Sequence, residues 1–339
     1  MRKEYIFIFG GAIGDALLGI HLGQVLAEAA PGSRLTLLST KKSSFTGQLA
    51  ALVPDVSYRE MPKNSVGSWF MLARLALTPH GIAYLEPFRN ALPLWWRIIA
   101  RAATVRSGSI EVCCRMRDGT TPRRVRSIRY DSKTDNLFEM IERVAGAWGL
   151  VPRRTQPSLP APACAPYTGR PYILFHFFAG TYRRSIPVGH ARDLLAAARK
   201  EYPRHEFVLT CAHQEEASAR RIAEGIADTR VAVSPPAQRL LCLLAQSSLC
   251  VGVASGVTHI AAHLRVPSVV LCNLSDPCWL PTYNPEVILL AAREQCGCRG
   301  DKTGECTAET PEGGVYRCLY YIKTADIVAG MRRLLPLKP

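Results

Sequence analysis

The sequence contains no run of 18 or more apolar residues that is free of charged side chains. The N-terminal apolar run Tyr5–Ile13 stops at Asp15, and Leu92–Val105 is interrupted by two arginines. A transmembrane helix needs about 20 apolar residues, so the sequence predicts none. Two basic residues before the first apolar run are typical of a signal peptide, but a glycine-rich segment follows at once and favours a strand and loop instead. We therefore expect a cytoplasmic protein.

Cysteine is too sparse for a disulfide scaffold, with 12 residues in a chain of 339. Cys211, Cys242, Cys250 and Cys272 lie among apolar residues, and we interpret them as small, reduced core side chains. Four others cluster near the C-terminus and are considered below.

Acidic side chains are also few. The 27 acidic residues face 42 basic ones, which gives a net charge of +15 and predicts an anionic partner such as a phosphate compound, a nucleic acid or an acidic membrane surface. No zinc-finger, RNA-recognition or helix-turn-helix pattern supports binding to nucleic acid, so we expect none. With 48% hydrophobic residues the chain is not disordered, and its length fits two domains.

The N-terminal segment has the pattern of a βαβ unit. The apolar run Tyr5–Phe9 predicts a strand. Three glycines follow and predict a turn, and leucines at three- and four-residue spacing then predict a helix. A second strand is expected at Leu35–Leu38, and strand, turn, helix and strand in this order imply a parallel sheet. The pattern is unclear between residues 64 and 130.

A proline-rich segment divides the chain. The boundaries we predict are an N-terminal domain (1–155), an extended linker (156–171), a C-terminal domain (172–323) and a terminal helix (324–339). Within the second domain the sequence predicts strands at 173–177, 206–210, 231–233, 249–253 and 268–271, and helices at 191–201, 215–227, 237–246 and 257–264. The expected fold is α/β, with two Rossmann-like, doubly wound parallel-sheet domains that face each other across a cleft.

Asp15 is the candidate catalytic residue. It follows Gly14 at the start of the first helix, where the helix dipole favours a negative charge. A carboxylate there could accept a proton from a hydroxyl nucleophile, or it could merely cap the helix.

Gly14, where the backbone can approach a ligand closely, and three further segments are candidate phosphate- or nucleotide-binding sites. Ser255, Gly256 and His259 open a helix after a strand, which is a natural phosphate seat or else an ordinary turn with a half-buried histidine. Thr181, Arg183 and Arg184 lie in another strand-end loop and suit a diphosphate, although a solvated basic loop is the alternative. Glu215 could accept hydrogen bonds from ribose hydroxyls or could compensate the helix dipole.

These segments resemble motifs of glycosyltransferase family 9, the heptosyltransferases of lipopolysaccharide synthesis. Gly14-Asp15 before a leucine-rich helix resembles the family's opening motif, whose aspartate is the catalytic base. Arg184-Ser-Ile-Pro187 resembles its Lys-x-Trp-Pro segment, and Glu215 has the place of its functional glutamate. The run from Ser255 to His259, with the later Ser275-Asp276-Pro277, resembles its most specific motif. Ala254 departs from the family, which usually has an acidic residue there.

The resemblance implies a GT-B fold and metal-independent, inverting transfer of a sugar, with ADP-heptose as the usual donor. The acceptor would be an anionic glycolipid, another glycan or a protein. A degenerate nucleotide-sugar-binding protein, another GT-B enzyme such as a nucleotide-sugar epimerase, and a basic nucleic-acid-binding protein are the alternative functions.

Cys296, Cys298, Cys306 and Cys318 lie in a glycine-rich segment, 296–318, that has little core of its own. Four thiolates could bind structural iron or zinc, or the cysteines could be reduced or paired in disulfides. The cluster resembles the four-cysteine iron site of heptosyltransferases that modify autotransporter proteins.

A basic region spans residues 97–130, where nine arginines meet only two acidic residues. Arg97 and Arg101 share one helical face, and neighbouring tryptophans and isoleucines supply apolar surface. This combination could contact the inner face of an anionic membrane, or it could be a core helix with a solvated arginine face.

Overall fold

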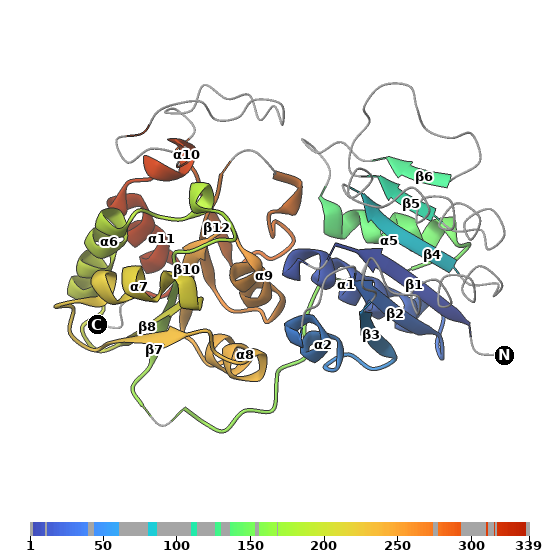
Figure 1. The fold of residues 1–339 in the computed structure, drawn as a ribbon, viewed down its shortest axis with the longest axis horizontal. Helices are drawn as coiled ribbons and strands as arrows, with labels where there is room; N and C mark the ends of the chain where they lie inside the picture. The colour runs from blue at the N-terminus through green and yellow to red at the C-terminus, as the bar shows by residue number, and fades with distance from the viewer. Residues whose placement is uncertain are drawn as a thin grey trace. The chain divides into compact units, whose positions relative to one another are not determined.

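The computed structural model describes residues 3–10, 12–39, 44–60, 81–86, 110–113, 126–129, 136–152, 156–167, 169–273, 277–292, 310, 315 and 317–336. They fall into two units, Met1–Pro157 and Ser158–Pro339. Within these residues each unit holds one six-stranded sheet, and every neighbouring pair of strands is parallel, as predicted (Figure 1). None of the described helices is long and apolar enough to cross a membrane.

The first unit has the strand order β3-β2-β1-β4-β5-β6. Three strands, β4, β5 and β6, fall in the region where the sequence pattern was unclear, and β3 lies just before it. The described elements are β1 (Glu4–Phe9), α1 (Ile13–Ala29), β2 (Arg34–Ser39), α2 (Ser44–Ala50), β3 (Val56–Glu60), β4 (Gly81–Glu86), β5 (Ile110–Cys113), β6 (Arg126–Arg129) and α5 (Leu137–Ala147). Most of the predicted basic region, 97–130, lies outside the described residues. The described parts of it are β5 and β6.

Helix α1 packs tightly on the sheet because glycines face the strands. A Cβ atom on Gly19 would lie 2.6 Å from Leu37 Cδ2, and one on Gly23 would lie 2.4 Å from Val56 Cγ2. The side chains of α1 are buried from Asp15 to Gly23, and α5 also contacts the helix. The beginning of α1, which holds Asp15, is therefore fixed in a close-packed environment.

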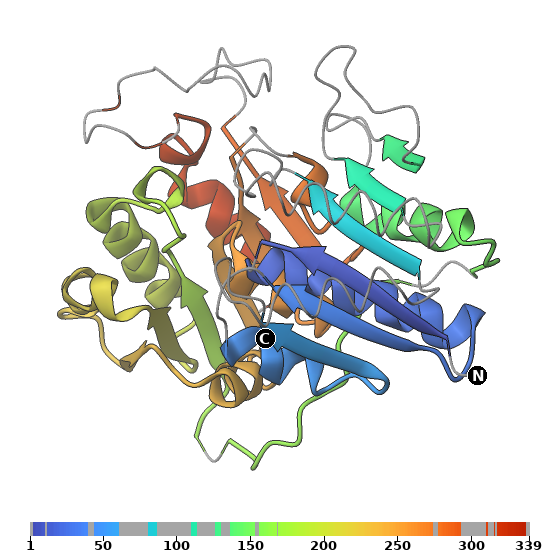
Figure 2. The same ribbon diagram turned by 45° about the vertical axis from the view of Figure 1, so that its right-hand side comes forward.

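The second unit has the order β12-β11-β10-β7-β8-β9, and helices cover both faces of its sheet (Figures 1 and 2). Side chains of α6, α7 and α11 form the core on one face, while α8 and α9 contact each other. The described elements are β7 (Tyr172–His176), η2 (Tyr182–Arg184), α6 (Val188–Glu201), β8 (Glu206–Cys211), η3 (His213–Glu215), α7 (Glu216–Ala223), β9 (Thr229–Val233), α8 (Ala237–Ala245), β10 (Leu249–Val253), α9 (Gly256–His263), β11 (Ser268–Leu271), η4 (Pro277–Trp279), β12 (Val287–Leu290), α10 (Arg317–Tyr320) and α11 (Thr324–Leu334).

The helix predicted at 215–227 is shorter than expected. It consists of one 3-10 turn and α7, which ends at Ala223. Gly225 has a φ of +75° and Asp228 a φ of +52°, and such left-handed residues cannot continue a helix. The other predicted elements of this unit agree with the structure to within about three residues at their ends.

Both sheets share one topological feature. In each, the first strand of the unit lies in the middle, and the chain adds strands first on one side of it and then on the other. The order reverses between β1 and β4 in the first unit and between β7 and β10 in the second. At this switch point the loops after the two adjacent strands run in opposite directions. The space between these loops, at the carboxyl ends of the strands, can hold a ligand.

The proline-rich linker contains no helix or strand in its described residues, and most of it lies on the second unit. The Leu159 amide donates to the His263 carbonyl at 2.8 Å, at the end of α9. The Tyr167 amide donates to Gln246 Oε1 at 2.6 Å, and Gln246 Nε2 donates to the Ala165 carbonyl at 3.1 Å. The linker is therefore bonded along its length rather than merely extended.

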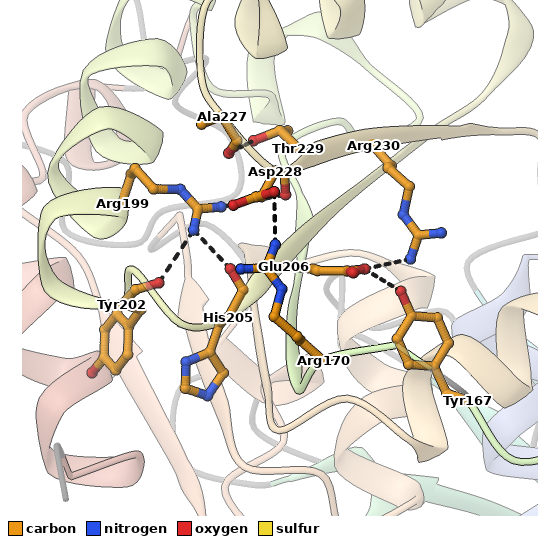
Figure 3. Close-up of polar contacts among 10 residues, drawn as sticks. All are labelled: Tyr167, Arg170, Arg199, Tyr202, His205, Glu206, Ala227, Asp228, Thr229 and Arg230. Carbon is orange, nitrogen blue, oxygen red and sulfur yellow. Dashed lines mark hydrogen bonds and ion pairs between the residues drawn. The ribbon is translucent and has the colours of Figure 1, made fainter.

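The end of the linker is also held by ion pairs near the start of β8 and β9 (Figure 3). Glu206 accepts hydrogen bonds from the Tyr167 hydroxyl and from Arg230, the latter at 2.7 Å. Arg170 pairs with Asp228 at 2.7 Å. These exposed pairs each contribute little stability, but together they fix where the linker ends.

The interpretation of Cys242 as a reduced core residue is wrong. Its side chain, on α8, forms a disulfide with Cys164 in the linker, with 5.6 Å between the two Cα atoms. The sequence does not reveal this pair because the two cysteines are 78 positions apart and nothing between them indicates that the linker lies against α8. Cys211, Cys250 and Cys272 are buried, as predicted.

Replacing both Cys164 and Cys242 with serine should lower the free energy of unfolding by about 2–4 kcal/mol, because the disulfide closes a long loop in the unfolded chain. Denaturant titration of both proteins, with and without dithiothreitol, measures the difference. Peptide mapping without reductant should recover the Cys164–Cys242 cross-link. If the wild type has the same midpoint with and without reductant, the disulfide does not contribute as described.

Candidate functional site

The start of α9 presents unused hydrogen-bond donors. Ser255 is the N-cap residue, and its amide donates to Thr258 Oγ1 at 3.0 Å. Among the described residues, Ser255 Oγ is buried with no hydrogen-bond partner, and the Gly256 and Val257 amides have none either. Amides at a helix N-terminus together with a serine hydroxyl form an anion-binding site. Ser255 and Gly256 thus lie at the start of a helix that follows a strand, and their binding of phosphate stays a prediction.

His259 lies one turn into α9 and is 7% exposed. Burial, and to a smaller extent the positive charge of Arg184, lower the pKa of His259 to about 4. The imidazole is therefore neutral at physiological pH. Because Arg184 acts on His259 electrostatically, the loop after β7 lies close to the start of α9, and two of the predicted segments come together.

The loop after β7 is closed by its own hydrogen bonds. The Ile186 amide donates to the Phe177 carbonyl at 2.9 Å and the Arg184 amide to the Thr181 carbonyl at 3.1 Å. The buried Ser185 accepts from the Ala179 amide at 3.0 Å through its hydroxyl. These bonds hold the loop in one conformation without a ligand.

The Arg184 side chain is exposed and makes one long hydrogen bond within the described residues. Its Nε–H is 3.5 Å from Thr181 Oγ1, and it forms no ion pair within the described part of the chain. Arg183 is half-buried and does have a partner. Of the two arginines, Arg184 is the one whose guanidinium is available to a phosphate.

Glu215 caps its own turn in this structure. Its Oε2 accepts a hydrogen bond from the backbone amide of Ala212 at 2.7 Å, and its Oε1 accepts one from the side-chain Nε2 of the exposed Gln214 at 3.2 Å. This is the structural alternative that the sequence left open. A role toward ribose requires only that the weaker bond to Gln214 be exchanged.

Sequence reasoning missed His176, the last residue of β7. Its Nδ1 lies 3.0 Å from Thr210 Oγ1, and burial lowers the pKa of His176 to about 4. Gly252 is opposite on β10, and a Cβ atom there would lie 2.4 Å from the His176 carbonyl oxygen. The sequence feature that could have drawn attention to it is a single histidine in an apolar run, shortly before the loop that holds Arg183 and Arg184.

Asp15 lies in the first turn of α1 and is 5% exposed. The N-cap residue is Ala12, which has no side-chain cap, so Asp15 and Gly14 are inside the helix rather than at its cap. A buried carboxylate is costly unless positive potential compensates it, and the helix N-terminus supplies such potential. Its burial distinguishes Asp15 from a solvated capping residue.

Three of the four predicted metal ligands, Cys296, Cys298 and Cys306, lie outside the described residues, and Cys318 is buried. In the parts of the chain that are described, no three histidine, cysteine, aspartate or glutamate side chains are grouped to hold a metal ion. The four-cysteine site therefore stays a prediction.

Mutation of Arg184 to glutamine should raise the pKa of His259 and leave that of His176 unchanged, because only His259 experiences the charge of Arg184. Histidine titration by NMR measures both.

The stability of the protein should also depend on pH. Because both folded pKa values lie below the value of 6.5 expected in the unfolded chain, the unfolded chain binds protons that the folded one does not bind as pH falls from 6.5 to 4. Stability should therefore fall by roughly 2 kcal/mol per histidine at pH 4.5. Constant stability between pH 7 and pH 4.5 would contradict the burial of both rings.

Residues 150–308 match the model of glycosyltransferase family 9 (heptosyltransferase). No curated protein matches the chain. Among solved structures, a family 9 glycosyl transferase from Veillonella parvula is similar over 98% of this chain and 97% of its own, with a TM-score of 0.71 and 16% identity. The ADP-heptose lipopolysaccharide heptosyltransferase II of E. coli is similar over 99% and 98%, with a TM-score of 0.66 and 17% identity.

A third similar structure is TibC from enterotoxigenic E. coli, an iron-containing dodecameric heptosyltransferase in complex with ADP-D-β-D-heptose. It is similar over 98% of this chain and 76% of its own, with a TM-score of 0.61 and 16% identity. At these identities the structures establish the fold, which is GT-B as predicted. The family match and the fold confirm the resemblance found in the sequence: the chain is a glycosyltransferase of GT-B fold that carries the family 9 (heptosyltransferase) domain in residues 150–308.

Proposed function

We propose that the protein transfers a heptose from ADP-heptose to a hydroxyl of a lipopolysaccharide-core or other glycan or protein acceptor, with inversion at the anomeric carbon. The observation that carries the proposal is the start of α9, where Ser255 Oγ and two backbone amides have no partner among the described residues and Arg184 lies close by. These groups match a diphosphate in charge and in hydrogen-bond type.

The donor would extend along the carboxyl ends of three adjacent strands. Ser255 follows β10, Arg184 follows β7 and Glu215 follows β8, and these strands are neighbours in the order β10-β7-β8. Two strand spacings are roughly 10 Å. That distance suits a nucleoside diphosphate, with its phosphates between Ser255 and Arg184 and its ribose toward Glu215.

Asp15 would act as general base in this reaction. It would take the proton of the acceptor hydroxyl as the oxygen bonds to the anomeric carbon and the bond from that carbon to the diphosphate breaks. Arg184 and the α9 amides would stabilise the negative charge on the leaving ADP. This positive potential is our reason to propose that the transfer needs no divalent cation.

The acceptor side of the proposal is supported by charge alone. The chain carries a net charge of +15, which suits an anionic glycolipid at the inner face of a membrane. The family's name and the donors named for the similar structures support heptose as the transferred sugar and lipopolysaccharide synthesis as the context.

Mutation of Arg184 to alanine should weaken the binding of ADP by about 10- to 100-fold, as expected for the loss of a charge-assisted hydrogen bond to phosphate. Arg192→Ala is the matched control, because Arg192 is exposed on α6 and only pairs loosely with Glu224 at 4.0 Å. Calorimetric titration with ADP, UDP and GDP measures the affinities. If wild type binds none of them, or binds ADP equally well without Arg184, the proposed donor site is wrong.

Mutation of Asp15 to alanine should cut turnover by roughly 10²- to 10⁴-fold with little change in donor binding, as expected for the loss of a general base. Release of ADP from ADP-heptose with a lipopolysaccharide-core acceptor measures turnover, and titration with ADP-heptose measures binding. Near-normal turnover in the variant would exclude the role. A wild type that binds ADP-heptose without any transfer would instead favour a degenerate binding protein, which Ala254 makes conceivable.

A further inference from the structure

Tyr182 is an unusually exposed aromatic side chain. Large apolar side chains of the described residues are mostly buried, and the exceptions are Val151, Tyr182 and Tyr321, of which Tyr182 is 57% exposed. Single exposed apolar residues are common on protein surfaces and need no explanation by themselves. Tyr182 differs because it lies between Thr181 and Arg183, inside the loop that supplies the phosphate-binding arginine.

The loop holds the backbone of Tyr182 in one conformation. Tyr182 opens the 3-10 turn η2, and its carbonyl accepts from the Ser185 amide at 2.9 Å. The turn is further held by the bonds from Arg184 to Thr181 and from Ile186 to Phe177. A ring on a rigid turn loses little conformational entropy when a ligand packs against it.

The chemistry of the neighbouring residues indicates which part of a ligand the ring would contact. Phosphate oxygens would bind the guanidinium of Arg184, two residues further on, whereas the electron-rich face of an aromatic ring does not attract an anion. The group bonded directly to the outer phosphate of a nucleotide-sugar is the pyranose ring. Its C–H groups form an apolar face, and aromatic faces pack against such surfaces.

We propose that Tyr182 is a donor-binding residue that stacks on the pyranose ring of the nucleotide-sugar and so favours the sugar-bearing donor over the free nucleoside diphosphate. The proposal rests on the function given above, because it takes Arg184 as the diphosphate ligand. It adds a contact that selects between donor and product at the same site.

Titration of the wild type, Tyr182→Ala and Tyr182→Phe with ADP and with ADP-heptose tests the proposal. The alanine variant should bind ADP-heptose about 3- to 10-fold more weakly, the effect of losing one aromatic packing contact, and should bind ADP as the wild type does. The phenylalanine variant keeps the ring and should bind both ligands within about two-fold of the wild type. Thermal unfolding should be unchanged in both variants, since the side chain is exposed.

Two results would overturn the proposal. One is unchanged ADP-heptose binding in the alanine variant. The other is equal weakening for ADP and ADP-heptose, which would place the ring on the nucleoside or indicate a disturbed loop. If the wild type binds neither ligand, the proposed function itself fails. If the wild type binds both ligands and the alanine variant binds ADP-heptose as tightly as the wild type does, only the role of Tyr182 fails.

Discussion

The position at which each parallel sheet reverses its strand order determines where the chain can hold a ligand. In both units the first strand lies centrally, and the chain turns away from it in opposite directions before and after. The residues after β1 include Asp15, and those after β7 and β10 include Arg184 and Ser255. The same rule of topology therefore places the candidate base in one unit and the candidate diphosphate ligands in the other at corresponding points.

The electrostatics of the second unit follow from this placement. His259 is buried one turn into α9 and His176 is partly buried at the end of β7, and both are neutral at physiological pH. The positive potential at the start of α9 thus comes from Arg184 and the helix amides rather than from a histidine charge. A neutral His259 can still donate one hydrogen bond, which is all that the sequence-based hypothesis asked of it.

Sequence reasoning predicted the parts of the fold that depend on local pattern. The strands and helices of the second unit were predictable because apolar periodicity and glycine or proline boundaries coincide there. The helix that ends at Ala223 was predicted too long because the sequence pattern does not show that Gly225 and Asp228 adopt positive φ. The Cys164–Cys242 pair was not predictable, since it depends on where the linker returns in space. His176 was missed for a similar reason: only the register shows that it pairs with Gly252 of β10, next to the start of α9.

The most direct test of the account is a crystal structure of the protein with ADP. The account predicts that diphosphate oxygens accept hydrogen bonds from Ser255 Oγ and the Gly256 amide, with the Arg184 guanidinium on the same phosphates. A nucleotide bound elsewhere on the chain, with Ser255 and Gly256 making no contact to it, would contradict the central claim.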